Sequence, residues 1–524
     1  MWRVFAVVLT LGLGFHAAPA RAIPTEALLD TLQRSAFQYF WTEANPANGL
    51  VKDRNTPGSV SSIAATGFGL SAICVGVDHG WITRTAAQTR VLATLQTFYN
   101  GPQSSAASGT IGYQGLFYHW LDMNTARRTW DSELSTIDTA LLFAGILDAR
   151  QYFSSNDPTD VQIRFLADTL YRRANWNFAR NLGAGIYMGW KPGTGFLNFG
   201  RWIGYNEAMI LYVLAIGSPT KPIPPSQWST WTSGYDWNSW YGQSYVEFAP
   251  LFGHQYSHAW IDFRGIQDDY MRSRGITYHE NSRRASLAQH AYCVANPFGW
   301  VGYADSLWGI TASDDPSGYL AHGAPPAQSE NGTIAPTAAL SSIVFTPEYS
   351  IPFAHKMWNT YRTQGWGPYG FTDAFNLTQD WWGSAVLGID QGPILLMIEN
   401  HRTGAVWNRF MQNADIQRGL TLAGFTPVTT GVGAEVSRDL RLALVSPNPG
   451  RGAAQLRYRL GSPGRLRLEV FDVAGRLVEV LAEGDHAAGE HSATFHGDGL
   501  PGGLYLARLQ VAGETLSQRI IRLR

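Results

Sequence analysis

Cysteine is nearly absent from this chain, since only Cys74 and Cys293 occur among its 524 residues. Both lie in apolar, helix-like segments, which favours two buried free thiols over a disulfide bridge. The chain has no cysteine spacing typical of a disulfide framework or a zinc site. We therefore expect the fold to depend on its apolar core rather than on cross-links.

Charged residues are also scarce, at 15% of the chain with a net charge of −1. Binding of nucleic acid needs a basic surface that replaces the counterions around the phosphates, so this class of partner is excluded. No Gly-rich phosphate loop or serine-nucleophile elbow stands out, because the glycines at Gly183 and Gly185 lack a preceding strand. Beyond the N-terminus, no apolar segment reaches the length of a membrane span.

Aromatic residues, in contrast, are abundant. They make up 13% of the chain and include 20 Trp and 23 Tyr. One interpretation is a large aromatic core; the other is a sugar-binding cleft, because the apolar C–H faces of a pyranose ring stack on indoles. Composition alone leaves both interpretations open.

The first 22 residues have the pattern of a signal peptide. Arg3 supplies a positive charge, residues 4–15 are apolar, and small residues at 18–22 offer a cleavage site. The apolar stretch is too short to cross a bilayer. We expect the mature chain to begin near Ile23 and to be secreted or held at the cell surface, with the periplasm as an alternative.

Residues 23–430 carry the periodicity of helices. In the first helix, which opens at Pro24, apolar residues recur every four positions from Leu28 to Phe40. Similar patterns predict helices at residues 61–77, 84–99, 135–152, 160–179, 205–216, 282–294, 336–344, 347–363, 393–402 and 407–423.

Long connections rich in Gly, Trp and Tyr separate these helices, for example residues 234–253 and 299–327. Loops of this length inside a compact domain are normally functional or disordered, and their aromatic content argues against disorder. About a dozen helices with long loops on alternate connections predict an all-α (α/α)6 toroid, with the loops gathered around a cleft at one end.

The pattern changes at Gly431. After a linker over residues 431–438, residues 439–524 alternate apolar and polar positions with turn residues between them, as in 456–460 and 504–509. Short strands of this kind predict a small all-β sandwich of immunoglobulin-like type. Because it contains no cluster of acids or histidines, we interpret it as an accessory domain.

Glu207 is the most informative carboxylate of the helical region. Nearly all of its neighbours between Trp202 and Tyr212 are apolar. Burial disfavours the charged form and raises the pKa of a carboxyl group. A raised pKa suits a general acid that protonates a glycosidic oxygen. The alternative is a structural carboxylate that accepts hydrogen bonds from Tyr205 or a neighbouring helix.

Asp390 lies in a Gly-flanked turn before a helix that we expect to begin at Pro393. A helix N-terminus stabilises the ionised form of an acid, which suits a general base or a ligand of sugar hydroxyls. Asp390 could instead simply cap the helix. Asp138 could likewise be structural or functional. Ser135 can cap its helix, which suggests a structural role for the segment, yet Asp138 itself would enter an apolar environment, which suggests contact with substrate.

Two histidines, His254 and His258, stand four residues apart. This spacing could place both on one helical face for a metal, but the surrounding glycine and aromatics indicate a loop, and no HExxH pattern exists. Histidine also hydrogen-bonds sugar hydroxyls, so we expect no metal and no cofactor.

Several longer motifs resemble the bacterial glucoamylase-like domain of glycoside hydrolase family 144, the endo-β-1,2-glucanases. The resemblance covers most of residues 25–425. Its motifs lie at residues 135–140, 203–207, 253–258, 260–264, 280–282, 308–313, 332–337 and 388–394.

The resemblance implies an (α/α)6 toroid that hydrolyses linear β-1,2-glucan with inversion and releases sophoro-oligosaccharides. It implies that Glu207 is the general acid and Asp390 the base, acting directly or through a substrate hydroxyl. The expected partner is this neutral polysaccharide, and we expect a monomer. The residues expected to bind substrate are Asp138, His119, Tyr205, His254, His258, Glu280, Arg283, Trp308, Asp373 and Trp382.

The C-terminal segment resembles flagellar-hook-capping-like domains and the C-terminal sorting domains of type IX secretion. The similar motifs are residues 445–449, 470–478 and 503–507. This similarity implies passage through an outer membrane, or attachment to the surface, with the help of secretion machinery.

Other functions remain as alternatives. A transglycosylase or an exo-acting β-glucan hydrolase could use the same scaffold. A polysaccharide lyase would need basic residues to neutralise a uronate, and the loops offer few beyond Arg264, Arg283 and Arg284. A non-catalytic glycan-binding surface protein is the last alternative.

Overall fold

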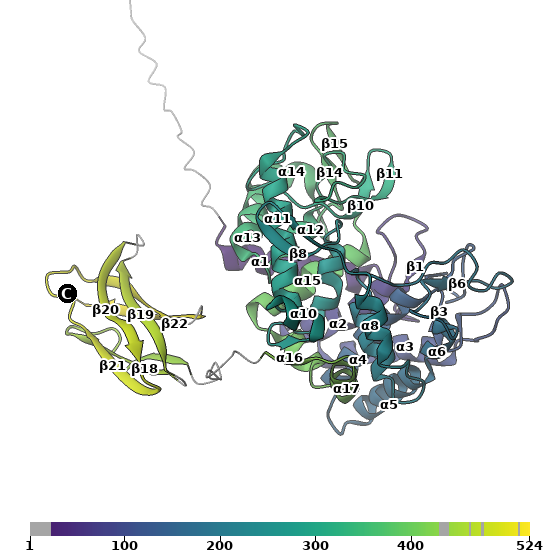
Figure 1. Ribbon diagram of the computed structural model, residues 1–524, viewed down its shortest axis with the longest axis horizontal. Helices are drawn as coiled ribbons and strands as arrows, with labels where there is room; N and C mark the ends of the chain where they lie inside the picture. Colours follow the sequence, from purple (N-terminus) through teal and green to yellow (C-terminus); the bar gives the residue numbers. More distant parts are fainter. Residues whose placement is uncertain (1–22, 429–439, 461–462, 473–475, 512–513, 524) are drawn as a thin grey trace, which may run out of the picture. The chain divides into compact units, whose positions relative to one another are not determined.

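The computed structural model describes residues 23–428, 440–460, 463–472, 476–511 and 514–523. The chain divides into two compact units, and the boundary in the sequence lies between Pro427 and Val428 (Figure 1). The first unit is helical and the second consists of strands. The expected signal peptide (1–22) and linker (431–438) lie outside the described residues.

Buried and half-buried helices alternate along residues 23–428. The buried segments consist almost entirely of inaccessible residues, whereas those between them bury one face. The buried segments are α2 (Ile63–Asp78), α4 (Thr136–Tyr152), α7 (Met209–Gly217), α9 (Phe252–Gln255) with the 3-10 helix η1 (Tyr256–Ala259), α12 (Pro336–Leu340) and α15 (Gly388–Arg402). The half-buried helices are α1 (Thr25–Thr42), α3 (Arg84–Asn100), α5 (Pro158–Arg173), α8 (Ser226–Thr232), α11 (Tyr278–Ala295), α13 (Pro347–Lys356) and α17 (Ala414–Leu422).

The buried segments contact one another in succession. Helix α2 packs on α4 and α15, α4 on α7, and α12 on α15. Ser257 of η1 accepts a hydrogen bond from the backbone N–H of Ile210 in α7 (3.0 Å), and Gln255 of α9 donates to the carbonyl of Ala338 in α12 (2.8 Å). Each buried segment is thus joined to the next, and the last returns to the first. The half-buried helices pack outside, as α1 does on α2 and α15.

The closest of these helix contacts joins α2 and α4. It depends on two glycines, because a Cβ at Gly145 would meet the carbonyl of Gly67, and a Cβ at Gly67 would meet the backbone of Leu141. Glycine at both positions lets the two backbones approach, which sets the position of the N-terminus of α4 relative to that of α2.

Short strand pairs and short helices fill the connections. Two segments predicted only as long aromatic loops contain hairpins, β7 (Trp237–Trp240) with β8 (Gln243–Val246) and β10 (Ala312–Asp315) with β11 (Gly318–Ala321). The other pairs are β1 (Ser61–Ser62) with β4 (Trp120–Leu121), β2 (Gly112–Tyr113) with β3 (Leu116–Phe117), β5 (Leu134–Ser135) with β6 (Gly189–Trp190), β9 (Ile266–Gln267) with β16 (Thr426–Pro427), β12 (Trp366–Gly367) with β13 (Gly370–Phe371), and β14 (Phe375–Asn376) with β15 (Trp381–Trp382). The remaining helical segments are α6 (Trp176–Arg180), α10 (Asp269–Arg274), the π-helix η2 (Met357–Tyr361), α14 (Arg362–Gly365) and α16 (Ala405–Phe410).

Several predicted helix boundaries are wrong for local reasons. The helix expected from 205 begins at Met209, because the Asn206 side chain accepts a hydrogen bond from the N–H of Ala208 (3.0 Å) and forms a turn. The helix expected from Pro393 begins at Gly388, with Pro393 inside it, so Asp390 lies in its first turn rather than before it. The segment that carries His254 and His258 is helical, not a loop.

The two cysteines are free and buried, as predicted. None of the helices in the described part of the chain is long and apolar enough to cross a membrane.

The C-terminal unit consists of two antiparallel sheets. One contains β17 (Arg441–Leu444), β18 (Ala454–Leu460) and β21 (Gly489–Phe495); the other contains β20 (Leu477–His486), β19 (Gly464–Asp472), β22 (Gly503–Val511) and β23 (Glu514–Arg522) (Figure 1). Alternate residues of β18 and β22, such as Leu456 and Leu509, form a common core, which confirms the predicted all-β unit. The Tyr505 hydroxyl donates to the carbonyl of Pro501 (2.8 Å), the bond made by a tyrosine corner.

Because the α2–α4 contact leaves no room for a Cβ, we expect Gly145→Ala to destabilise the helical unit by about 1–3 kcal/mol, the usual effect of overpacking. Thermal or denaturant unfolding measures this loss. Gly265→Ala is the matched control, since a Cβ there meets nothing within 4 Å and its φ is not in the left-handed region. Equal stability of the two variants would contradict the close approach.

Candidate active site

A cavity of about 650 Å³ lies in the helical unit. Its wall carries three acids (Asp53, Asp138, Glu207), two basic side chains (Arg54, His119) and five aromatic ones (Trp120, Trp130, Phe252, Tyr256, Tyr319). This mixture of apolar rings with few charges is typical of a site for a small neutral ligand.

The N-terminal ends of buried helices converge on this cavity. Ser62 caps α2, Asp138 lies in the first turn of α4, Glu207 precedes α7, and Ile389 lies in the first turn of α15; all four line the cavity. Helix N-termini present unpaired N–H groups and a partial positive charge. The arrangement therefore gathers backbone N–H donors around a cavity that also contains acidic side chains.

Glu207 is a half-buried acid that enters this cavity without a partner. No other residue in the described part of the chain donates a hydrogen bond to its carboxyl group, and Tyr205, the expected donor, bonds to Ser282 instead (3.4 Å). Ser257 fixes the backbone by donating to the carbonyl of Glu207 (3.0 Å). Burial raises the pKa of Glu207 to about 7, and the charge of Asp138 adds to this rise. Near neutral pH, Glu207 can therefore hold a proton that it gives to a ligand.

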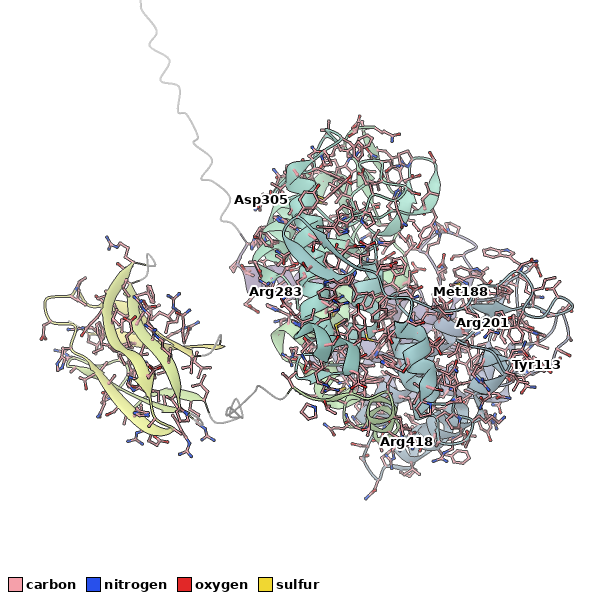
Figure 2. All side chains as sticks on the ribbon, viewed as in Figure 1. Tyr113, Met188, Arg201, Arg283, Asp305 and Arg418 are labelled. Carbon is pink, nitrogen blue, oxygen red and sulfur yellow. The ribbon has the colours of Figure 1, made fainter. Side chains whose placement is uncertain are left out.

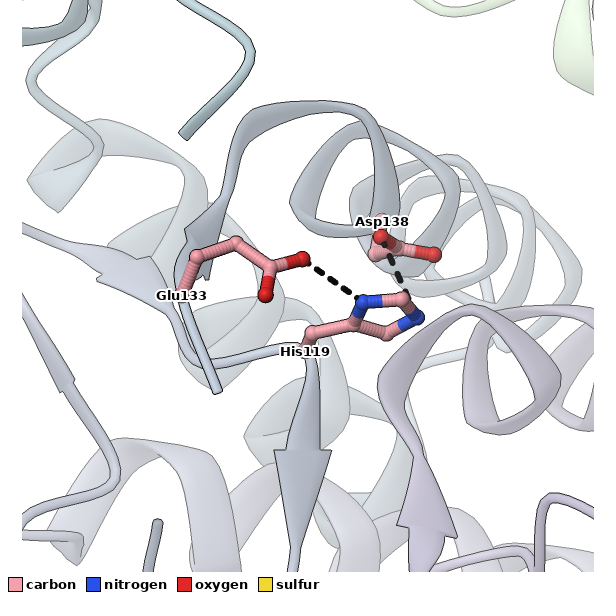
Figure 3. Close-up of side chains that lie close together, drawn as sticks. All are labelled: His119, Glu133 and Asp138. Atoms are coloured by element: carbon pink, nitrogen blue, oxygen red, sulfur yellow. Dashed lines mark hydrogen bonds and ion pairs between the residues drawn. The ribbon is translucent and has the colours of Figure 1, made fainter. Parts of the chain in front are cut away.

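Asp138 belongs to a second group with His119 and Glu133 (Figure 3). Ser135 caps α4 as predicted, accepting from the N–H of Asp138 (3.2 Å), and its hydroxyl donates to the Asp138 carboxylate (2.5 Å). His119 Nδ1 lies 2.8 Å from Glu133 Oε1, and its Nε2 lies 3.6 Å from Asp138 Oδ2. Burial lowers the pKa of His119, but the two carboxylates outweigh it and raise this pKa to about 8. The imidazole is thus a cation at neutral pH.

These three residues are also the ones that could hold a metal ion, since one ligand atom from each lies within 4.8 Å of the others. Their contacts fit an imidazolium better. The two carboxylates face different ring nitrogens, and both nitrogens donate when the ring is protonated. A metal would need one deprotonated ring nitrogen to share a point with both carboxylates.

Asp390 forms a pair with Asp373. The two buried carboxyl groups lie within hydrogen-bonding reach of each other, and Asp373 Oδ2 also accepts from the N–H of Asp314 (2.7 Å). The remaining oxygens, Asp373 Oδ1 and Asp390 Oδ2, have no other donor among the described residues. Burial and the charge of its partner raise the pKa of Asp390 well above its usual range. The pair can therefore share one proton.

Asp53 and Arg54, which sequence reasoning missed, stand beside this pair. Arg54 binds Asp53 (3.2 Å) and Asp314 (3.1 Å), and the segment from 53 to 55 pairs with residues 386–388 at the start of α15. Arg54 thus supplies positive charge next to a group of acids. No motif around residue 53 marks this role, because Asp314 and residues 386–388 lie more than 250 positions away in sequence.

Tyr256 connects the two acid groups. The charges of Asp390, Glu207 and Asp138 all act on its hydroxyl and, together with burial, raise its pKa well above the usual value. Asp390 does not itself line the cavity, but its neighbours Leu387 and Ile389 do. The acids of α4, α7 and α15 therefore belong to one electrostatic environment.

Four predicted ligands lie in the core instead of the cavity, which corrects their assignment. Trp308 and His254 are fully inaccessible, and His258 bonds to Ser282 (3.1 Å). The rings of Tyr205 and His254 are in contact in a tilted arrangement, with centroids 4.7 Å apart. Burial lowers the pKa of His254 to about 3, so this ring is neutral. The aromatic pattern of a core resembles that of a cleft, which is why the sequence did not distinguish them.

Three further predicted ligands also do not line the cavity. Arg283 is half-buried on α11, where it pairs with Glu348 (3.1 Å), and Figure 2 shows it at the surface. Glu280 pairs with Arg284 (2.8 Å) in the first turns of the same helix. Trp382 stacks on Phe375 at 4.6 Å. Of the ten predicted ligands, the cavity wall includes Asp138 and His119.

Comparison with known proteins identifies the family. Residues 200–414 match the family model "Glycoamylase: Putative glucoamylase". A crystal structure of a "putative glucoamylase" from Bacteroides uniformis is 36% identical, with a TM-score of 0.72 over 78% of this chain and 99% of that one. An endo-β-1,2-glucanase from Chitinophaga pinensis, in complex with sophorotriose and glucose, is 31% identical, with a TM-score of 0.71 over 77% of this chain and 99% of that one.

The chain belongs to glycoside hydrolase family 144. This confirms the resemblance seen in the motifs. A further relative is an exo-β-1,2-glucooligosaccharide sophorohydrolase (non-reducing end) from Parabacteroides distasonis, 34% identical over 432 residues. The match covers 75% of this chain, and the chain spans 57% of the length of that relative.

The position of His119 in this family 144 site makes stability depend on pH. Its pKa is raised in the folded state, so its stabilising effect is complete below about pH 6.5 and is lost as pH rises through about 8, by up to about 2 kcal/mol. We expect His119→Gln to remove this loss from melting curves recorded between pH 6 and 9. His401→Gln should leave it in place, since burial lowers the pKa of His401. An unchanged pH dependence in His119→Gln would contradict the imidazolium.

Proposed function

We propose that this protein hydrolyses β-1,2-glucan with inversion at the anomeric carbon. The observation that carries this proposal is Glu207, an acid of the cavity wall whose carboxyl group accepts no hydrogen bond from another described residue and has a pKa of about 7. The family 144 relatives support the linkage, because both named enzymes act on β-1,2-linked glucose. We also infer that the closed succession of buried helices is the (α/α)6 toroid expected from the sequence.

In this mechanism, Glu207 gives its proton to the glycosidic oxygen as the bond to the anomeric carbon breaks. The Asp390–Asp373 pair retains one negative charge while it shares a proton, so Asp390 can take a proton from the attacking water, directly or through a substrate hydroxyl. Inverting enzymes hold their two carboxyl groups about 6.5–9.5 Å apart to admit this water. The new reducing end should therefore appear first as the α-anomer.

Charge around the cavity supports a neutral substrate. Arg54 is neutralised by Asp53 and Asp314, and His119 by Glu133 and Asp138. A uronate, as in the lyase alternative, would need an uncompensated cation. We therefore prefer a neutral glucan.

We propose an endo mode, with an exo mode that releases sophorose as the second candidate. The glucanase from Chitinophaga pinensis favours the first and the sophorohydrolase from Parabacteroides distasonis favours the second. A time course of products from long β-1,2-glucan separates them. Early oligosaccharides of many lengths indicate endo cleavage, and sophorose alone from the start indicates exo cleavage.

We also propose that the protein is exported and acts as a monomer, and that the C-terminal β unit serves its sorting or attachment. The pattern of residues 1–22 and the resemblance of the C-terminal segment support this proposal. Fractionation of cells with and without residues 440–524 would test it. An enzyme that stays in the cytoplasm would contradict export.

The first prediction for catalysis concerns the acid. Glu207→Gln keeps the shape of the side chain but cannot donate the proton, so we expect kcat on β-1,2-glucan to fall about 10³-fold or more. Reducing-end assays on a panel of β-1,2-, β-1,3-, β-1,4- and α-1,4-glucans measure this. Glu280→Gln is the control, because Glu280 lies outside the cavity wall, and it should retain activity. Near-wild-type activity of Glu207→Gln would show that Glu207 is not the general acid.

The second prediction distinguishes the members of the acid pair. Asp390→Asn should lower kcat about 10²- to 10⁴-fold, since it removes the base. Asp373→Asn should retain measurable activity and move the acidic limb of the pH–rate profile to lower pH. The physical reason is that it removes the charge that raises the pKa of Asp390 and offers an N–H donor in its place. The opposite pattern would make Asp373 the base.

A further inference from the structure

An exposed tryptophan stands at the cavity wall. The Trp130 side chain is 69% exposed, the highest exposure of any aromatic residue in the described part of the chain, and it also lines the cavity that holds Glu207. Most large rings of the helical unit are buried in the core. An exposed indole retains apolar surface that a ligand can cover.

The backbone holds this indole in a conformation that the chain does not adopt freely. Trp130 has φ of +54°, in the left-handed region that disfavours a bulky side chain. Such strain persists only where the surroundings fix it, and it is common at ligand sites.

The neighbours of Trp130 are fixed on both sides. Arg128 has a side chain that is only 4% exposed; it donates to the carbonyls of Ser132 (2.7 Å) and Ala107 (2.8 Å). Asp131 binds both Arg128 (2.8 Å) and Lys191 (2.7 Å). These contacts hold the chain on both sides of Trp130, whose side chain lines the cavity wall.

A row of rings leads from Trp130 toward the acids. Trp130 lies edge-on to Trp120 with centroids 6.1 Å apart, and Trp120 stacks on His119 at 3.8 Å. His119 in turn faces Asp138, whose charge acts on Glu207. Trp130 is the outer end of this row, and the rings of Trp120 and His119 lie between it and Asp138.

The indole itself carries no charge, and Arg128 and Lys191 are paired with Asp131. The chemistry that such a surface recognises is the apolar face of a neutral pyranose ring.

We propose that Trp130 is the stacking platform of an outer glucosyl subsite, which binds a glucose unit of the substrate remote from the bond that is cleaved. This inference rests on the proposed β-1,2-glucanase function and names how the same cavity holds a longer chain. Trp130 contributes binding and not chemistry, so its effect falls on KM for substrates long enough to reach it.

The test compares Trp130→Ala and Trp130→Phe with the wild-type full chain on long β-1,2-glucan and on the shortest β-1,2-oligosaccharide that it cleaves. We expect Trp130→Ala to raise KM for the long glucan about tenfold, the effect of one lost aromatic contact, while kcat stays within about twofold. Trp130→Phe should recover part of the loss. For the short substrate, KM should not change.

The matched control is Phe165→Ala, since Phe165 is 59% exposed on α5 and does not line the cavity. It should leave both kinetic constants unchanged. Melting temperatures show whether each variant is folded, and removal of an exposed ring should not lower them.

Two negative results are distinguishable. A wild-type protein that releases no product from β-1,2-glucan would overturn the proposed function and this inference with it. A wild-type protein that cleaves the glucan, together with an unchanged KM in Trp130→Ala or an equal loss on long and short substrates, would overturn the inference alone.

Discussion

The convergence of helix N-termini on one cavity is the constraint on which this site depends. Acids at sequence positions as distant as 53 and 390 reach one electrostatic environment because α2, α4, α7 and α15 begin there. That convergence requires the buried helices to pack in succession, and the glycine contact between α2 and α4 is its tightest point. The partial positive charge of these helix ends offsets part of the cost of collecting so many carboxyl groups.

Around this cavity, two environments give the carboxyl groups different pKa values. For Glu207, burial is the largest influence on the pKa, and together with the charge of Asp138 it favours the protonated form. Asp390 and Asp373 lie within hydrogen-bonding reach of each other, so they can share a proton and keep one negative charge between them. Glycoside hydrolysis requires an acid that holds a proton and a base that can accept one. Here the difference in pKa behaviour between Glu207 and the aspartate pair arises from packing rather than from residue type.

Local sequence patterns predicted much of this structure, whereas contacts between distant segments could not be predicted. Period-four apolar residues gave the helices, alternation gave the β unit, and Ser135 gave the cap that orients Asp138. Glu207 could be chosen because its apolar neighbours are adjacent in sequence. Asp53 and Arg54 were missed because their partners come from the distant segments around Asp314 and Asp390. Trp308 and His254 were assigned to substrate because an aromatic core and an aromatic cleft have the same composition.

The central claim is that the protein holds Glu207 protonated near neutral pH. Its most direct test is titration of that carboxyl group itself, by difference infrared spectra of wild type and Glu207→Gln or by carbon NMR of labelled glutamate, in the absence of substrate. The account predicts a pKa of about 7 for Glu207. A value close to the ordinary 4.5 of a solvated glutamate would contradict it.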